Sequence, residues 1–82
     1  MYDIIFSETA AKQLKKLEKV ISDRIVSTLE RIRVRPEAYV KKLVGDPGYR
    51  LRVGDYRVIL DIDGKKLLIL VLKVGHRRNI YE

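Results

Sequence analysis

The sequence predicts an α+β domain in which a two-helix antiparallel hairpin packs on one face of a mainly antiparallel β-sheet, in the order β-α-α-β-β-β. Two observations lead to this prediction. Apolar residues recur with the period of a helix in the first half of the chain, and with the two-residue period of a strand after residue 48. Two glycine-containing turns, Gly54-Asp55 and Asp63-Gly64, then divide the second half into segments of strand length.

The first half is predicted to form one strand and then two helices. Residues 2–6 are a short β-prone run. Ser7 follows in the position of a helix N-cap, with Glu8 in the first turn, where the helix dipole favours an acid. Ser22-Asp23 is predicted to cap a second helix, so the two helices would join around residues 20–22 and the second would end at Pro36. The apolar positions at helical spacing are Ala10, Leu14, Leu17, Ile21, Ile25, Leu29 and Ile32.

The second half is predicted to form a connector and three strands. Residues 36–48 hold both prolines and are interpreted as a connector, with Leu43 and Val44 against the core. Residues 49–53 and 56–62 read as strands around Gly54-Asp55, where glycine in the first central position favours a type II′ hairpin. The unbroken apolar run 67–72 is typical of a central strand covered on both faces, and a short polar tail follows.

Composition restricts the function. The 82 residues, 46% apolar and 35% charged, are expected to form a single domain over 1–82 rather than a disordered chain. Cysteine is absent and His76 is the only histidine, which argues against a disulfide framework, a thiol nucleophile and a structural metal site. Neither a signal peptide nor a membrane-spanning run is visible, so we expect a cytoplasmic protein. The net charge of +7 favours a nucleic acid or an acidic protein as partner.

Three arginines are predicted to share one face of the hairpin. A two-residue turn at Gly54-Asp55 places Arg52 opposite Arg57 and Arg50 opposite Ile59, on the face that does not meet the helices. Like charges directly opposite each other are unfavourable by a few tenths to about 1 kcal/mol. A solvated basic face that keeps the sheet soluble is one interpretation. Because lysine would serve solubility equally well, arginine at all three positions favours phosphate binding, for which its planar bidentate group is suited.

The C-terminal tail adds further candidates. It leaves the predicted central strand beside the hairpin, so it can bring His76, Arg77 and Tyr81 to the edge of the arginine face. His76 is either an exposed loop residue or a substrate contact. Tyr81 is either an anchor for the tail or a group that exchanges a proton, since nearby cations stabilise a phenolate.

Two sequence blocks carry a family resemblance. Tyr49-Arg50-Leu51-Arg52 with Tyr56-Arg57, and His76-Arg77-Arg78 followed by Tyr81, together resemble the RelE/ParE superfamily of bacterial and archaeal toxins, and the RelE branch most of all. The resemblance spans the whole chain. It implies the toxin of a type II toxin–antitoxin pair, an endoribonuclease that cleaves mRNA in the ribosomal A site. RelE toxins need no metal and no cofactor for this reaction, because a ribose 2′-OH attacks the adjacent phosphate.

The resemblance also implies residue roles. Arg50 and Arg52 match a basic pair that is Lys-Lys in the best-known members. Since guanidinium hardly ever gives up its proton, these two would stabilise charge only. Arg57 matches the arginine that holds the phosphate, Arg77 one that assists the leaving group, and Tyr81 a general base. Further RNA contacts are expected from His76, Arg78, Lys41 and Lys42.

Partners and alternatives follow from the same resemblance. A RelB-like antitoxin, often acidic and folding on binding, would hold the toxin in a hetero-oligomer, and the ribosome with its mRNA would be the second partner. No membrane is involved in this interpretation. A ParE-like inhibitor of DNA gyrase with the same fold is one alternative, and a toxin homologue that has lost catalysis and only binds its antitoxin is another.

Overall fold

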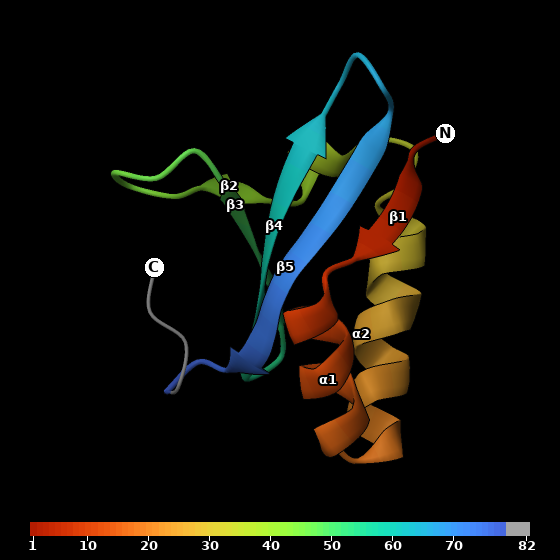
Figure 1. Ribbon diagram of the computed structural model, residues 1–82, viewed down its shortest axis with the longest axis vertical. Coiled ribbons are helices and arrows are strands. Elements are labelled where there is room, and N and C mark those ends of the chain that lie inside the picture. The colour runs from red at the N-terminus through yellow and green to blue at the C-terminus, as the bar shows by residue number, and fades with distance from the viewer. Residues whose placement is uncertain (79–82) are drawn as a thin grey trace.

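The computed structural model describes residues 1–78 and confirms the predicted fold class: two helices cover one face of a mixed, mostly antiparallel sheet (Figure 1). Within these residues the sheet has five strands in the order β1-β5-β4-β3-β2, and only β1 is parallel to its neighbour. We call the covered side the helix face and the other side the open face. The elements are β1 (Asp3–Phe6), α1 (Glu8–Lys16), α2 (Lys19–Arg31), the 3₁₀ helix η1 (Pro36–Ala38), β2 (Lys41–Lys42), β3 (Tyr49–Val53), β4 (Tyr56–Asp63) and β5 (Leu68–His76).

Ser7 connects β1, α1 and β5. Its Oγ accepts a hydrogen bond from the Ala10 N–H at 3.0 Å, which confirms the predicted N-cap. The same hydroxyl donates to the carbonyl of Leu72 at 2.9 Å, and the Ser7 N–H donates to the carbonyl of Val71 at 2.8 Å. Strand β1 ends at Phe6, so Ser7 is the first residue beyond it. The two hydrogen bonds from Ser7 to β5 therefore extend the pairing of β1 with β5 by one residue.

The predicted helix junction at residues 20–22 is wrong. Leu17 leaves the helix with extended dihedral angles (φ −83°, ψ 154°), and α2 begins at Lys19. Ser22 is therefore inside α2, where its hydroxyl donates to the Lys19 carbonyl at 3.1 Å instead of capping a helix. Glu18, at the actual N-cap, forms no side-chain cap hydrogen bond, so the sequence carries no capping signal at the true junction.

The predicted end of α2 at Pro36 is also wrong. The helix ends at Arg31, and Pro36 instead starts η1. The intervening chain is held by the start of the molecule: the Tyr2 N–H donates to the Arg33 carbonyl at 2.9 Å, and Arg33 Nε donates to the Tyr2 carbonyl at 2.7 Å. Arg33 is thus hydrogen-bonded to Tyr2 instead of forming a further turn of α2.

The main core lies between the helices and the helix face. The predicted alternation of the hairpin is confirmed, since Leu51, Val53, Val58 and Leu60 are buried against the helices. Their partners in this core are Ala10, Ile25, Leu29, Ile32, Ile69, Val71 and Val74. Burial of these side chains supplies the dominant favourable term for folding.

The open face departs from the prediction. Leu43 is buried, but with Ile59 and Leu72 in a small separate cluster on the open face, and Val44 is 92% exposed rather than packed against the core. Residues 67–72 are not covered on both faces either, because Leu70 remains exposed. Neither helix in residues 1–78 has the length and apolar character needed to cross a membrane.

A one-residue bulge interrupts β5 and resets which face its side chains occupy. Leu60 pairs with Val71 but the preceding Ile59 pairs with Lys73, so Leu72 has no opposite residue in β4. Beyond the bulge Val74 lies on the helix face and Gly75 pairs with Arg57 on the open face. Without the extra residue, every later side chain of β5 would change sides.

Replacing Ser7 by alanine is expected to lower the free energy of unfolding by about 1–3 kcal/mol, because the change removes a helix cap and one donor to the Leu72 carbonyl. Urea denaturation followed by circular dichroism measures this effect. Ser22→Ala is the matched control and should cost less than about 0.5 kcal/mol, since that hydroxyl is exposed. Equal stability of the two variants would contradict the connecting role of Ser7.

Candidate functional site

The β3–β4 hairpin has the register that the sequence predicted. The pairs are Val53 with Tyr56, Arg52 with Arg57, Leu51 with Val58 and Arg50 with Ile59. Gly54 has φ +60°, and Asp55 after it does not have a positive φ, as the predicted type II′ turn requires. A side chain at position 54 would be strained, so glycine sets the turn and the turn sets the register.

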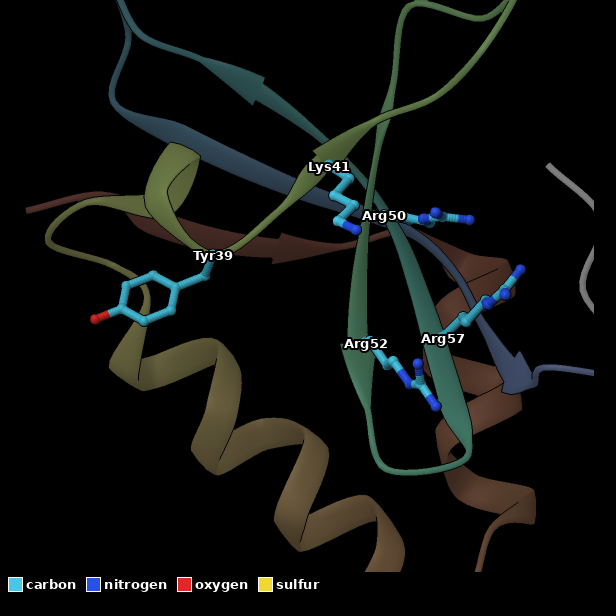
Figure 2. Close-up of a pocket in the computed structure, with 5 residues that line it drawn as sticks. All are labelled: Tyr39, Lys41, Arg50, Arg52 and Arg57. Atoms are coloured by element: carbon cyan, nitrogen blue, oxygen red, sulfur yellow. The ribbon is translucent and has the colours of Figure 1, made fainter.

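Four cationic side chains gather on the open face as a result. Lys41, Arg50, Arg52 and Arg57, which we call the cationic cluster, line a hollow of about 130 Å³ together with Tyr39. Figure 2 shows the arginines extending from the two strands of the hairpin, with the Tyr39 ring directed away from them. The predicted arginine face is therefore present, and a fourth cation joins it.

Strand β2 supplies this fourth cation. Lys41 pairs with Arg50 and shares its face, whereas Lys42 pairs with Tyr49 and points to the other side. Val40 packs against the main core, so the side chains of Tyr39 and Lys41 on either side of it fall outside that core. Sequence reasoning missed Tyr39 and β2. The alternation of polar and apolar side chains at Tyr39, Val40 and Lys41 was the sequence feature that indicated an extended segment. Strand β2 has only two residues, which is too short to recognise as a strand from the sequence.

Two arginines of the cluster face each other across the hairpin. Arg52 stands directly opposite Arg57, and Arg52 Nε donates a long hydrogen bond of 3.4 Å to the Gly54 carbonyl. Among the acids along this part of the chain, Asp55 lies in the turn two residues before Arg57, and Asp61 lies four residues beyond it in β4, roughly 13 Å along the strand. Asp61 also accepts the Ile62 N–H at 2.9 Å. The hollow is thus a concentrated positive site suited to phosphate groups.

The start of the tail is fixed beside the hairpin turn. The Arg77 N–H donates to the Asp55 carbonyl at 2.9 Å, which continues the β4–β5 pairing by one residue. Arg77 itself lies in the turn just beyond β5, beside the end of the hairpin that carries Arg57. Arg78 is exposed. Tyr81 lies outside the described residues.

His76 occupies the opposite side of the sheet from the position expected for an RNA contact. It pairs with Tyr56, and the two rings meet edge to face with centroids 5.3 Å apart. Together with Gln13, Lys16 and Leu17 of α1, these rings line a hollow of about 280 Å³ on the helix face. The structure therefore separates His76 from the cationic cluster, which the sequence had grouped together.

An apolar hollow adjoins the cluster on the open face. It encloses about 260 Å³ between strands β4 and β5 and the loop before β3, and its floor is the small cluster of Leu43, Ile59 and Leu72. Ile59 is the direct neighbour of Arg50, so the apolar hollow and the cationic cluster form one continuous surface. Asp46, Pro47, Gly48 and Lys73 complete the lining.

Comparison with known proteins gives a consistent result. The family model described as the ParE toxin of the type II toxin–antitoxin system parDE matches residues 4–81. The mRNA interferase toxin RelE of Escherichia coli (strain K12) is 28% identical over 79 residues, which is 93% of this chain and 83% of the relative. Toxin RelE3 of Methanocaldococcus jannaschii is 31% identical over 85 residues, covering 96% and 94%. The RelBE2 toxin–antitoxin complex of Mycobacterium tuberculosis contains a similar chain, with a TM-score of 0.86, 28% identity and coverage of 93% and 98%.

Replacing Arg52 by glutamine is expected to raise the free energy of unfolding by a few tenths to about 1 kcal/mol at low salt, because it removes one of two directly opposed charges. Salt screening should shrink this gain. Urea denaturation at low and high ionic strength measures both effects. Lys65→Gln, in the turn between β4 and β5, serves as the control with the same loss of charge. A destabilised Arg52 variant would show that the opposed arginines do not repel.

Proposed function

Because the chain belongs to the RelE/ParE superfamily of toxins of type II toxin–antitoxin systems, as its sequence resemblance predicted, we propose that it is a ribosome-dependent endoribonuclease that cleaves mRNA in the A site. One observation carries the proposal. The cationic cluster places three guanidinium groups and an ammonium group around one hollow on a rigid sheet. This arrangement is suited to holding a phosphate group of RNA.

The proposed reaction uses the RNA itself as nucleophile. The ribose 2′-oxygen loses its proton and bonds to the adjacent phosphorus, while the bond from phosphorus to the 5′-oxygen of the next nucleotide breaks. The products are a 2′,3′-cyclic phosphate and a fragment whose 5′-oxygen takes up a proton. No water molecule is consumed in this step, so the protein has to supply orientation, charge stabilisation and two proton transfers.

Charge stabilisation is assigned to the cationic cluster. Negative charge accumulates on the phosphate oxygens in the transition state, and fixed donors aimed at it are worth about 10²–10³ in rate each. The guanidinium groups of Arg50, Arg52 and Arg57 would donate hydrogen bonds and supply charge, but they would not transfer a proton. Their placement on paired strands reduces the reorganisation that the reaction requires.

Proton transfer is assigned to the tail. Tyr81 is proposed as the general base at the 2′-oxygen, since cations nearby stabilise its phenolate. Arg77 is proposed to stabilise the departing 5′-oxygen, because its backbone is tied to Asp55 at the end of the hairpin that carries Arg57. General acid–base assistance of this kind contributes about 10²–10⁴ in rate.

Ribosomal RNA provides a second set of phosphates. Lys41 lies in the cluster and Arg78 is exposed beyond β5, so these two suit contacts around the cleavage site. Lys42 points to the other side of β2, so we propose that it contacts ribosomal phosphates away from the cleavage site. Binding through several phosphates should weaken steeply as the salt concentration rises.

We also propose a RelB-like antitoxin as the partner of this chain. The similar chain in the Mycobacterium tuberculosis structure forms a toxin–antitoxin complex. Here the cationic cluster and the adjoining apolar hollow suit an acidic segment with apolar side chains along one side. Such a segment would occupy the site that the RNA needs, which gives a direct means of inhibition.

Inhibition of DNA gyrase is the second candidate. It is favoured by one observation, the ParE description of the family model that matches residues 4–81. The arginine content of the cluster and the RelE names of the curated relatives favour the ribonuclease instead.

We predict that Arg57→Ala and Arg77→Ala each reduce cleavage of ribosome-bound mRNA at least tenfold, because each removes a cation from the charge that develops at the phosphate. Single-turnover cleavage on programmed ribosomes, read by primer extension, measures the rate. Lys65→Ala is the control. It removes one positive charge in the turn between β4 and β5, at the opposite end of β4 from the Gly54-Asp55 turn, and this variant should cleave at the wild-type rate.

The same preparations separate the two candidate functions. Cuts within the A-site codon by the wild-type protein support the ribonuclease. If the protein cuts no mRNA but traps gyrase–DNA cleavage complexes when it is incubated with gyrase and DNA, gyrase inhibition is the correct function. Wild-type rates in both arginine variants would mean that the site is elsewhere.

A further inference from the structure

His76 makes contacts that suit a structural task rather than an RNA contact. Its Nδ1 accepts the backbone N–H of Arg78 at 3.2 Å, and its ring meets that of Tyr56 edge to face. The residue between them, Arg77, donates its own N–H to the Asp55 carbonyl at 2.9 Å. The three-residue segment 76–78 is therefore fixed at three points: a ring, a side-chain acceptor and a backbone hydrogen bond.

The strand pairing explains why the two rings meet. Arg77 and Asp55 are joined by a ladder hydrogen bond, so the next pair inward, His76 with Tyr56, is of the non-hydrogen-bonded kind. Side chains in such pairs approach each other more closely than in hydrogen-bonded pairs, which favours contact between aromatic rings. The bulge at Leu72 places His76 on the same face as Tyr56.

The hydrogen bond also specifies the state of the imidazole. A backbone N–H can only donate, so Nδ1 has to be the unprotonated nitrogen, and the ring is neutral with its proton on Nε2. A second proton on Nδ1 would face the Arg78 N–H and break this bond.

We infer that His76 is a positioning residue for the proposed cleavage: through the Arg78 N–H and the Tyr56 ring it holds the turn that carries Arg77 beside the hairpin turn at Asp55. This inference rests on the proposed function for its effect on rate. His76 itself does not touch the RNA in this arrangement, because its ring lies on the helix face.

The hollow around the ring is lined without an acid in residues 1–78. Lys16 of α1 and Tyr56 of β4 line it, and the Arg78 N–H meets the ring from the tail. Gln13, also in this hollow, accepts the Val74 N–H at 2.6 Å.

Two substitutions separate the acceptor from the ring. His76→Asn places a side-chain oxygen where it can accept the N–H two residues on, as asparagine does in turns, and it does not titrate. His76→Ala removes the acceptor. At pH 8 we expect His76→Ala to lower the single-turnover rate about tenfold with little change in the apparent affinity for programmed ribosomes, since a small displacement of a positioned group has effects of this order. His76→Asn should stay within about threefold of the wild type.

The affinity for the ribosome provides the second readout. Weakened ribosome affinity with an unchanged rate in both variants would mean that His76 contacts RNA, and it would overturn the inference. Equal losses of rate in both variants would overturn it as well.

A readout that needs no activity keeps the two proposals distinguishable. In ¹⁵N-resolved spectra of the full chain, His76 should show an unprotonated Nδ1, and the Arg78 amide signal should move in His76→Ala but not in His76→Asn. A proton on Nδ1 at pH 8 would refute the inference whether or not the protein cleaves RNA. Failure of the wild type to cut programmed mRNA would instead refute the proposed ribonuclease. Thermal melting of both variants shows whether they remain folded.

Discussion

The register of the β3–β4 hairpin is the constraint on which the rest of the structure depends. Leu51 and Val58 are buried while Arg52 and Arg57, one residue away on each strand, lie on the open face. A slip of one residue would bury the arginines and expose the core, so hydrophobic burial and the turn at Gly54 enforce the same pairing. The cationic cluster is therefore held by the same interaction that folds the sheet.

This coupling has an energetic consequence. Arg52 and Arg57 stand directly opposite each other, so their mutual repulsion works against the register that burial enforces. A polyanion or an acidic partner segment that binds the cluster would remove this repulsion and stabilise the folded state by mass action. RNA and an antitoxin would then compete for the same cationic cluster, and either would relieve the same repulsion. Binding of RNA would lead to cleavage, whereas binding of the antitoxin would prevent it.

Local sequence signals predicted the parts of the fold that local interactions determine. Ser7 caps α1 and Gly54 sets the hairpin, and each acts within a few residues of itself. In contrast, Glu18 at the junction of the two helices forms no side-chain cap hydrogen bond. The two residues of β2 are held in place by their pairing with β3. Val44 was expected in the core because it is apolar, but the loop after β2 carries it into solvent. These features depend on contacts between distant segments, which periodicity and propensity do not encode.

The bulge in β5 is the clearest example of this limit, and it decides the site. Nothing in the apolar run marks Leu72 as an extra residue, yet its presence places His76 against Tyr56. The Leu72 carbonyl accepts the hydroxyl of Ser7, and its side chain packs with Leu43 and Ile59 beside the cluster. With a regular strand here, His76 would lie on the open face instead of meeting Tyr56. The contact between the start of α1 and the bulge therefore helps to fix the part of β5 that pairs with Arg57.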